Sequence, residues 1–160
     1  MVNEKFEEAF ALIVEGKKYA EKGIGFRAMR CYRASLRVFP TPEAHFRLGE
    51  EYFSRYNYTK AAKQFMIAME LDPYFPLPVY GMASVYFAVL RFEKAILWFE
   101  KAITMGDINL KALSYFGIGQ VLEEQGNSTK ALEFYFKAHK LVPDDSKTLD
   151  SIVYLLACRN

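Results

Sequence analysis

Residues with catalytic or metal-binding chemistry are few and scattered in this chain of 160 residues. The two histidines, His45 and His139, have no companion at the spacing typical of metal ligands. Glu123-Glu124 and Asp144-Asp145 are adjacent acidic pairs, but neighbouring side chains on a helix point in different directions. There is no glycine-rich phosphate loop and no Ser, His and Asp ordering typical of a hydrolase. The sequence therefore argues against an enzyme and predicts no cofactor and no metal.

A row of four arginines is the strongest local concentration of charge. Arg27, Arg30, Arg33 and Arg37 are three or four residues apart, so they share one side of a helix and could meet phosphate or an acidic partner. No aromatic platform accompanies them, and we interpret the row as a solvated outer face, with nucleic-acid binding as a distant alternative. The whole chain has 21 basic and 19 acidic side chains, a net charge of +2, which gives no general attraction to nucleic acid or acidic membranes.

The elements that carry these residues repeat along the chain. An alanine is followed by an aromatic residue four positions on, a small residue three further, and in three copies a proline five beyond that: Ala28-Tyr32-Ser35-Pro40, Ala61-Phe65-Ala68-Pro73, Ala95-Phe99-Ala102-Asp107 and Ala131-Tyr135-Ala138-Pro143. Twelve residues before each alanine is a small residue (Gly16, Gly49, Ala83, Gly119), which we expect to lie where two helix backbones approach closely. Steps of 33, 34 and 36 residues between the alanines are typical of stacked helical hairpins.

The second copy resembles the tetratricopeptide repeat family through Leu48-Gly49, Tyr52, Ala61, Phe65, Ala68 and Pro73. The resemblance implies an all-α fold: an α-solenoid, or superhelix, of antiparallel helix pairs with about nine helices. We expect one domain over 1–160, with repeats at about 9–41, 42–75, 76–111 and 112–145 and a C-terminal helix at about 146–159. Glu15, Asp107 and two extra residues near 106–111 depart from the pattern and predict local changes of the hairpin or turn.

Capping residues and prolines predict where the helices begin and end. Asn3 is expected to cap the first helix, Thr41 the third and Asp144 or Asp145 the ninth. The expected spans are about 3–22, 26–39, 42–55, 58–71, 77–90, 92–105, 110–125, 128–142 and 146–159.

The resemblance also implies a ligand groove along the inner face of the first helix of each pair. The candidate groove residues are Phe10, Ile13, Lys17, Phe46, Arg47, Glu50, Phe53, Tyr80, Ser84, Phe87, Phe116 and Gln120. Aromatic anchors separated by a few polar groups suit an apolar or amphipathic segment of another protein. We therefore predict a protein-binding adaptor or assembly factor. A chaperone-like role, in which the groove shelters an apolar client segment, belongs to the same prediction. The alternative for some of these rings is packing against neighbouring helices.

The terminal helix of a solenoid needs a polar outer face, but the last expected helix is apolar on more than one side. Leu149, Ile152, Val153 and Leu156 are expected to cover the fourth repeat, which leaves Tyr154, Leu155 and Cys158 as a candidate oligomer interface. The second function class is therefore a self-assembling scaffold, with a homodimer through this helix or further repeats in a longer parent. The alternative is that Tyr154 and Leu155 fold back onto the groove.

The compartment is predicted from cysteines and apolar segments. Cys31 and Cys158 lie in distant elements, so we expect both to be reduced, as in the cytoplasm. Residues 1–8 are charged and mixed, unlike a secretory signal. Residues 73–90 carry no charge, but prolines at 73, 76 and 78 leave too short a helix to span a membrane. We expect a cytoplasmic protein without a membrane partner.

The chaperone-binding adaptors of this family hold a terminal carboxylate with Lys and Asn side chains of the first repeat, Asn of the second, and Lys and Arg of the third. The matching positions here hold Ile13, Lys17, Arg47, Leu77 and Gly81, and the register one repeat later also lacks the set. We expect no binding of a peptide ending in Glu-Glu-Val-Asp by this mechanism, which titration calorimetry would check. Micromolar binding that Arg47→Ala abolishes would contradict the prediction.

Overall fold

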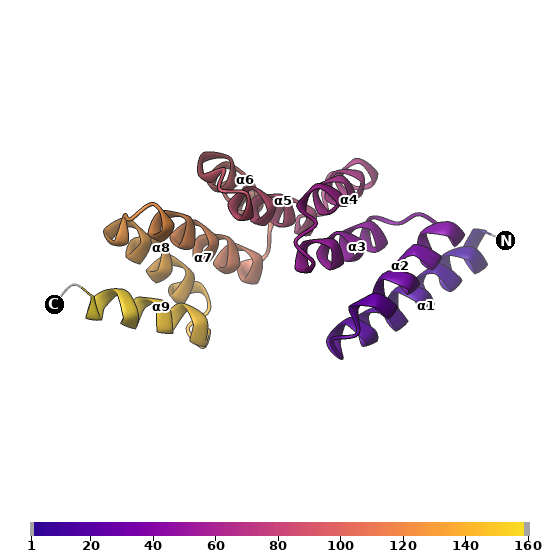
Figure 1. Cartoon of the computed structure of the whole chain (residues 1–160), viewed down its shortest axis with the longest axis horizontal. Helices are drawn as coiled ribbons and strands as arrows, with labels where there is room; N and C mark the ends of the chain where they lie inside the picture. The colour runs from indigo at the N-terminus through magenta and orange to yellow at the C-terminus, as the bar shows by residue number, and fades with distance from the viewer. Residues whose placement is uncertain (1, 159–160) are drawn as a thin grey trace. The chain divides into compact units, whose positions relative to one another are not determined.

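The computed structural model describes residues 2–158, which form nine α-helices and no strand (Figure 1). In chain order the helices are α1 (Val2–Glu21), α2 (Gly25–Val38), α3 (Pro42–Ser54), α4 (Tyr58–Leu71), α5 (Leu77–Ala88), α6 (Phe92–Met105), α7 (Ile108–Glu124), α8 (Ser128–Leu141) and α9 (Ser146–Ala157). The all-α class with consecutive antiparallel helix pairs is thereby confirmed.

The chain divides into two compact units, an N-terminal unit (Met1–Gly81) and a C-terminal unit (Met82–Asn160), with the boundary inside α5. In the N-terminal unit α1 packs on α2, α2 on α3, and α3 on α4. In the C-terminal unit α6 packs on α7, α7 on α8, and α8 on α9. A single domain over 1–160 stays a prediction.

Two of the predicted helix caps are confirmed. The Thr41 hydroxyl oxygen accepts a hydrogen bond of 3.2 Å from the Ala44 amide, and Pro42 occupies the first turn of α3. Of the two aspartates before α9, Asp145 is the cap, since its carboxylate accepts from the Thr148 amide at 3.1 Å. The capping oxygens satisfy backbone amides that have no partner within the helix.

Two other expectations about helix ends are wrong. Helix α1 already includes Val2, so Asn3 lies inside it, where its side-chain amide donates to Glu7 Oε1 at 3.2 Å. The seventh helix, expected to begin at about Leu110, begins at Ile108, and Asp107 is its N-cap and accepts from the Leu110 amide at 2.9 Å. The residue that replaces the proline therefore starts the next helix.

The turn inside each helix pair uses the same backbone conformation. Its left-handed residue comes five positions before the repeat alanine in all four pairs: Gly23 (φ 71°), Tyr56 (φ 59°), Leu90 (φ 57°) and Gly126 (φ 76°). The amide of the next residue bonds back into the first helix, as from Asn57 to the Tyr52 carbonyl at 2.9 Å. Leu90 therefore belongs to the turn, which is why α5 ends at Ala88, two residues before its predicted end.

An aromatic ring of the second helix occupies the space left by a glycine of the first helix. A Cβ atom built on these glycines would lie 2.4–2.5 Å from the nearest ring carbon in the pairs Gly16–Tyr32, Gly49–Phe65 and Gly119–Tyr135. The rings of Tyr32, Phe65 and Tyr135 are fully buried. The small residues thus make room for a ring rather than for close backbone contact.

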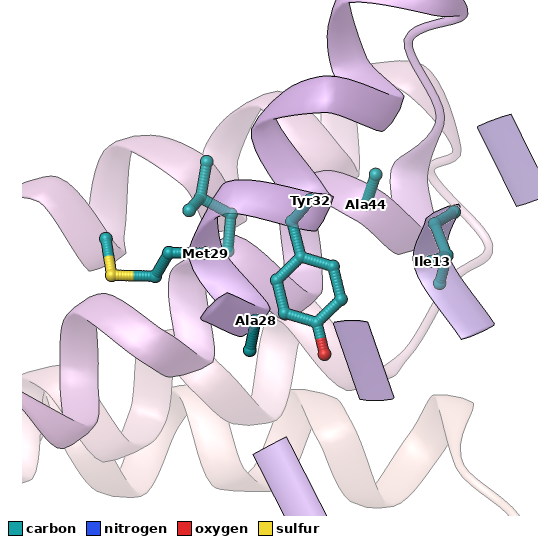
Figure 2. Close-up of a cluster of buried hydrophobic side chains, with 6 residues drawn as sticks. Ile13, Ala28, Met29, Tyr32 and Ala44 are labelled. Carbon is teal, nitrogen blue, oxygen red and sulfur yellow. The ribbon is translucent and has the colours of Figure 1, made fainter. Parts of the chain in front are cut away.

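Two of the rings also face a glycine from the helix that follows. A Cβ on Gly81 would lie 2.8 Å from Phe65, and one on Gly117 would lie 2.5 Å from Phe99. In the first pair, Tyr32 lies amid Ile13, Ala28, Met29 and Ala44 (Figure 2). Each ring is therefore part of the core that joins consecutive helices within a unit.

The glycine at 119 provides a test of this packing. In Gly119→Ala the added methyl group collides with the buried Tyr135 ring. Overpacking costs about 1–3 kcal/mol, more than the ~1 kcal/mol that alanine gains in helix propensity. We expect the free energy of unfolding, measured by urea denaturation, to fall by up to about 2 kcal/mol.

The matched control is Gly25→Ala in α2. There the nearest atom to an added Cβ is the carboxylate oxygen of Glu51, the end of a flexible side chain that can move away. Its free energy of unfolding should change by less than about 0.5 kcal/mol or rise. Stabilisation by Gly119→Ala would contradict the packing described here.

Candidate functional site

The N-terminal unit contains an apolar pocket of about 570 Å³, which we call the α1 pocket. Phe6, Phe10, Ile13 and Lys17 line it from α1, and the turns after α2 and α4 close it. Phe6 and Phe10 are 46% and 55% exposed, whereas Ile13 is buried. Two large rings are therefore available at its edge above an apolar base.

The pocket follows from helix periodicity and from two aromatic residues in turns. Positions 6, 10, 13 and 17 fall on one face of α1. Phe39, after the end of α2, makes an edge-on contact with Phe6, their ring centroids 5.8 Å apart. Phe75, after α4, makes a similar contact of 5.5 Å with Phe46. These turn residues supply walls that α1 alone lacks.

A network of charges lies at one side of the α1 pocket. Glu43 Oε1 lies 3.6 Å from Lys17 Nζ and accepts a hydrogen bond of 2.8 Å from Arg47 Nε. Arg47 Nη1 also donates to Glu50 Oε2 at 2.9 Å. Lys17 and Arg47 are the cations at the positions where the family's clamp residues would stand, and both already have carboxylate partners. An incoming carboxylate would have to displace Glu43.

The pKa values of this network agree with its geometry. Burial by itself would lower the pKa of Arg47, but its hydrogen bond to Glu43 and the charges of both glutamates raise it above the ordinary value. Desolvation raises the pKa of Glu50, and Arg47 opposes that rise. Burial raises the pKa of the neighbouring Tyr32 to about 12. Arg47 is therefore held charged between two carboxylates.

The structure places the predicted groove residues of the N-terminal unit in different surroundings. Phe10, Ile13 and Lys17 line the α1 pocket. Phe46, expected in the groove, is only 5% exposed because its ring packs on Phe65 and Phe75, so its assignment as an accessible anchor is wrong.

The remaining predicted groove residues are partly accessible. Phe53 is half-buried and packs on Tyr58 with centroids 5.4 Å apart, and Tyr80 is half-buried. In the C-terminal unit Ser84, Phe87 and Gln120 are half-buried, as is Phe116, which lines a cavity of about 210 Å³ between α7, α8 and α9. A continuous groove through all four repeats stays a prediction.

Three rings of the α1 pocket were missed by sequence reasoning: Phe6, Phe39 and Phe75. Phe6 could have been found, since it continues the row of Phe10 and Ile13 by one helical turn. Phe39 and Phe75 lie between helices, outside the first-helix positions that the family groove uses. Only the folded turn brings them to the pocket.

The apolar face of α9 differs from the predicted one. Thr148, Ile152 and Leu155 are buried, and the last two belong to a cluster with Leu132 and Tyr135 of α8. Leu155 is therefore wrong as an interface residue, whereas Tyr154 and Cys158 are exposed as expected. The stripe expected to cover the fourth repeat is largely exposed instead: Leu149 46%, Val153 58% and Leu156 44%.

The arginine row of α2 also differs from expectation, because aromatic rings do accompany it. The Arg27 guanidinium lies 5.5 Å from the ring centroid of Tyr19 in α1. The Arg33 guanidinium lies 5.8 Å from that of Tyr52 in α3 and donates a hydrogen bond of 2.8 Å to its hydroxyl. The rings come from neighbouring helices, so the α2 sequence alone does not show them.

Residues 2–158 offer neither a metal-binding cluster nor a membrane-spanning helix. No group of three or more His, Cys, Asp or Glu side chains lies close enough to hold a metal ion in this part. None of its helices is both long and apolar enough to cross a membrane.

The helix pairs, their repeated turns and the glycine-and-ring packing define an all-α helical-repeat protein. A family model described as tetratricopeptide repeat matches residues 80–146. Together with the fourfold sequence pattern, this match over part of the chain supports a protein of the tetratricopeptide repeat family.

Several known proteins are similar to this chain in sequence or in structure. The chain is 32% identical to anaphase-promoting complex subunit 6 of Arabidopsis thaliana over 96 residues, 58% of this chain but only 17% of that protein. A structure of PilF from Pseudomonas aeruginosa matches 97% of this chain and 70% of its own with a TM-score of 0.86 and 18% identity. A structure of Cut9 in its complex with Hcn1 matches 95% of this chain and 30% of its own, with a TM-score of 0.84 and 18% identity. The two structural similarities concern the fold.

Proposed function

We propose that this chain is a non-catalytic adaptor or assembly module that binds an apolar or amphipathic segment of another protein in the α1 pocket. The tetratricopeptide repeat fold supports a role in protein interaction or assembly. Similarity to a subunit of a large complex agrees with that role. The proposed setting is the cytoplasm, and the free thiols of Cys31 and Cys158 support a reducing compartment.

The exposed rings of Phe6 and Phe10 above an apolar pocket carry this proposal. Large aromatic side chains that can be desolvated at the centre of an interface supply most of the binding free energy in typical complexes. Here the rings are held in place, since Phe6 packs on Phe39 and Ile13 lies beneath them. A surface ordered before binding loses less conformational entropy when a partner arrives.

The charges beside the pocket favour an apolar segment over an acidic terminus. Lys17 and Arg47 are already paired with Glu43, so neither provides a free cation. An amphipathic helix can place its apolar side in the pocket and keep its polar side in water. The same arrangement would shelter an apolar client segment, which is the chaperone-like version of the proposal.

Replacement of Phe10 tests the pocket directly. Peptides would be selected from a display library of apolar and amphipathic sequences, and their affinities measured by fluorescence anisotropy. Phe10→Ala should weaken the selected binders roughly ten-fold or more, as expected for an interface anchor. The protein should stay folded, because the Phe10 ring is 55% exposed.

The matched control is Phe136→Ala in α8, which removes a ring that is 49% exposed in the other unit. It should leave the affinity unchanged. Selection of only acidic peptides, or apolar binders that Phe10→Ala does not weaken, would count against the α1 pocket.

A second candidate function is self-assembly through α9. Leu149, Val153 and Leu156 form an exposed stripe, because they recur at spacings of four and three residues. Contiguous exposed apolar surface can mark a protein interface. A second copy of the chain could cover it by burying the same stripe of its own.

Light scattering during size-exclusion chromatography would test self-assembly. The unaltered protein should dimerise as its concentration rises, and Val153→Glu should restore the monomer, since a charge at that position would be buried unpaired. Phe136→Glu, which places a charge on α8, should leave the dimer intact. A monomer at every concentration would rule out this candidate.

A further inference from the structure

We propose that the outer face of α2 binds an acidic helical segment of a partner protein, at a site separate from the α1 pocket. The helix carries Arg27, Arg30, Arg33 and Arg37 and no acidic residue over Gly25–Val38. The second helices of the other pairs, α4, α6 and α8, each contain both signs of charge. Only α2 among them therefore presents charge of a single sign.

All four arginines are exposed. Among the residues that the structure describes, no carboxylate oxygen comes within 4.0 Å of their guanidinium nitrogens. Glu15 of α1 lines the same hollow as Arg27 and Arg30 without reaching that distance. Arg47 differs from them, because it donates hydrogen bonds to the carboxylates of Glu43 and Glu50. Apart from the Arg33 N–H that donates to the Tyr52 hydroxyl, the guanidinium groups of α2 can hydrogen-bond another molecule.

Two of the guanidinium groups are already positioned by aromatic rings. Tyr19 supports Arg27, and Tyr52 both supports Arg33 and accepts its hydrogen bond. Arginine can bind a carboxylate through two parallel hydrogen bonds, and a fixed guanidinium loses less side-chain entropy in doing so. The rings therefore prepare part of the row for binding.

The spacing of the arginines fits the spacing of carboxylates along another helix. Arg30, Arg33 and Arg37 span seven residues, which is about 10 Å along the helix axis at 1.5 Å per residue. Glutamates at intervals of three and four residues on a partner helix have the same separation. A hollow of about 400 Å³ between α1 and α2, lined by Leu12, Tyr19 and Ala34 as well as Arg27 and Arg30, offers room for an apolar side chain of that helix.

Two observations favour a protein segment over nucleic acid. A cation of this chain already lies against the ring of Tyr19, and two lie near the ring of Tyr52, with Lys60 5.6 Å from its centroid, so both rings offer less free surface for base stacking. The net charge of +2 also supplies little long-range attraction for a polyanion.

The test uses a designed helical peptide of about 20 residues, long enough to hold helical structure, with glutamates at alternating intervals of three and four on an alanine background. Its match has glutamine in place of glutamate. Fluorescence anisotropy should show salt-sensitive binding of the glutamate peptide and none of the glutamine peptide. The combined variant Arg30→Gln, Arg33→Gln and Arg37→Gln should lose roughly ten-fold or more in affinity.

The control variant combines Lys94→Gln, Lys101→Gln and Lys137→Gln, which removes the same formal charge from exposed side chains of α6 and α8. It should retain the affinity, as should Phe10→Ala in the α1 pocket, and circular dichroism should show that every variant keeps its helices. An equal loss in both triple variants would overturn the proposal. So would tighter arginine-dependent binding of single-stranded DNA with no binding of the glutamate peptide.

Discussion

The fit between a glycine of one helix and an aromatic ring of the next is the contact on which the other features depend. Tyr32, Phe65 and Tyr135 each occupy space that any Cβ at Gly16, Gly49 or Gly119 would fill. Protein interiors are close-packed, so a ring that fills the space beside a glycine sets the distance between the two helices. Phe65 and Phe99 also face glycines of the following helix, and the same contact then continues from one pair to the next within each unit.

Because these rings and glycines hold the helices, side chains elsewhere are free to serve other purposes. On α1 the row from Phe6 to Lys17 borders a pocket, and on α2 the arginines face outward. The arginines beside these two surfaces differ in whether they have carboxylate partners. Arg47 is partly buried and needs Glu43 and Glu50 to offset desolvation, whereas the α2 arginines are hydrated and can stay unpaired. The N-terminal unit therefore presents an apolar surface and a cationic one.

Several features were predictable because their causes are local. Thr41 followed by Pro42 predicts a helix start, since both the capping oxygen and the proline ring act within one turn. Asn3 misled because a capping residue acts only outside the helix, and α1 extends past it. Glycine adopts the left-handed conformation easily, as Gly23 and Gly126 do in two of the turns. Tyr56 and Leu90 adopt it in the other two turns, where the residue type does not predict it and only the position in the repeat does.

The sequence by itself determined the helix pairs, because the spacing of alanine, aromatic and small residues recurs whatever the neighbours are. It also determined which side of α1 and α3 would be apolar. The tertiary structure decided that Phe10 is exposed while Phe46 is buried, because Phe75 arrives from a turn to cover Phe46. It likewise decided which stripe of α9 is buried, since successive residues lie about 100° apart around a helix and both stripes are apolar. Periodicity specifies a face, but burial depends on what packs against it.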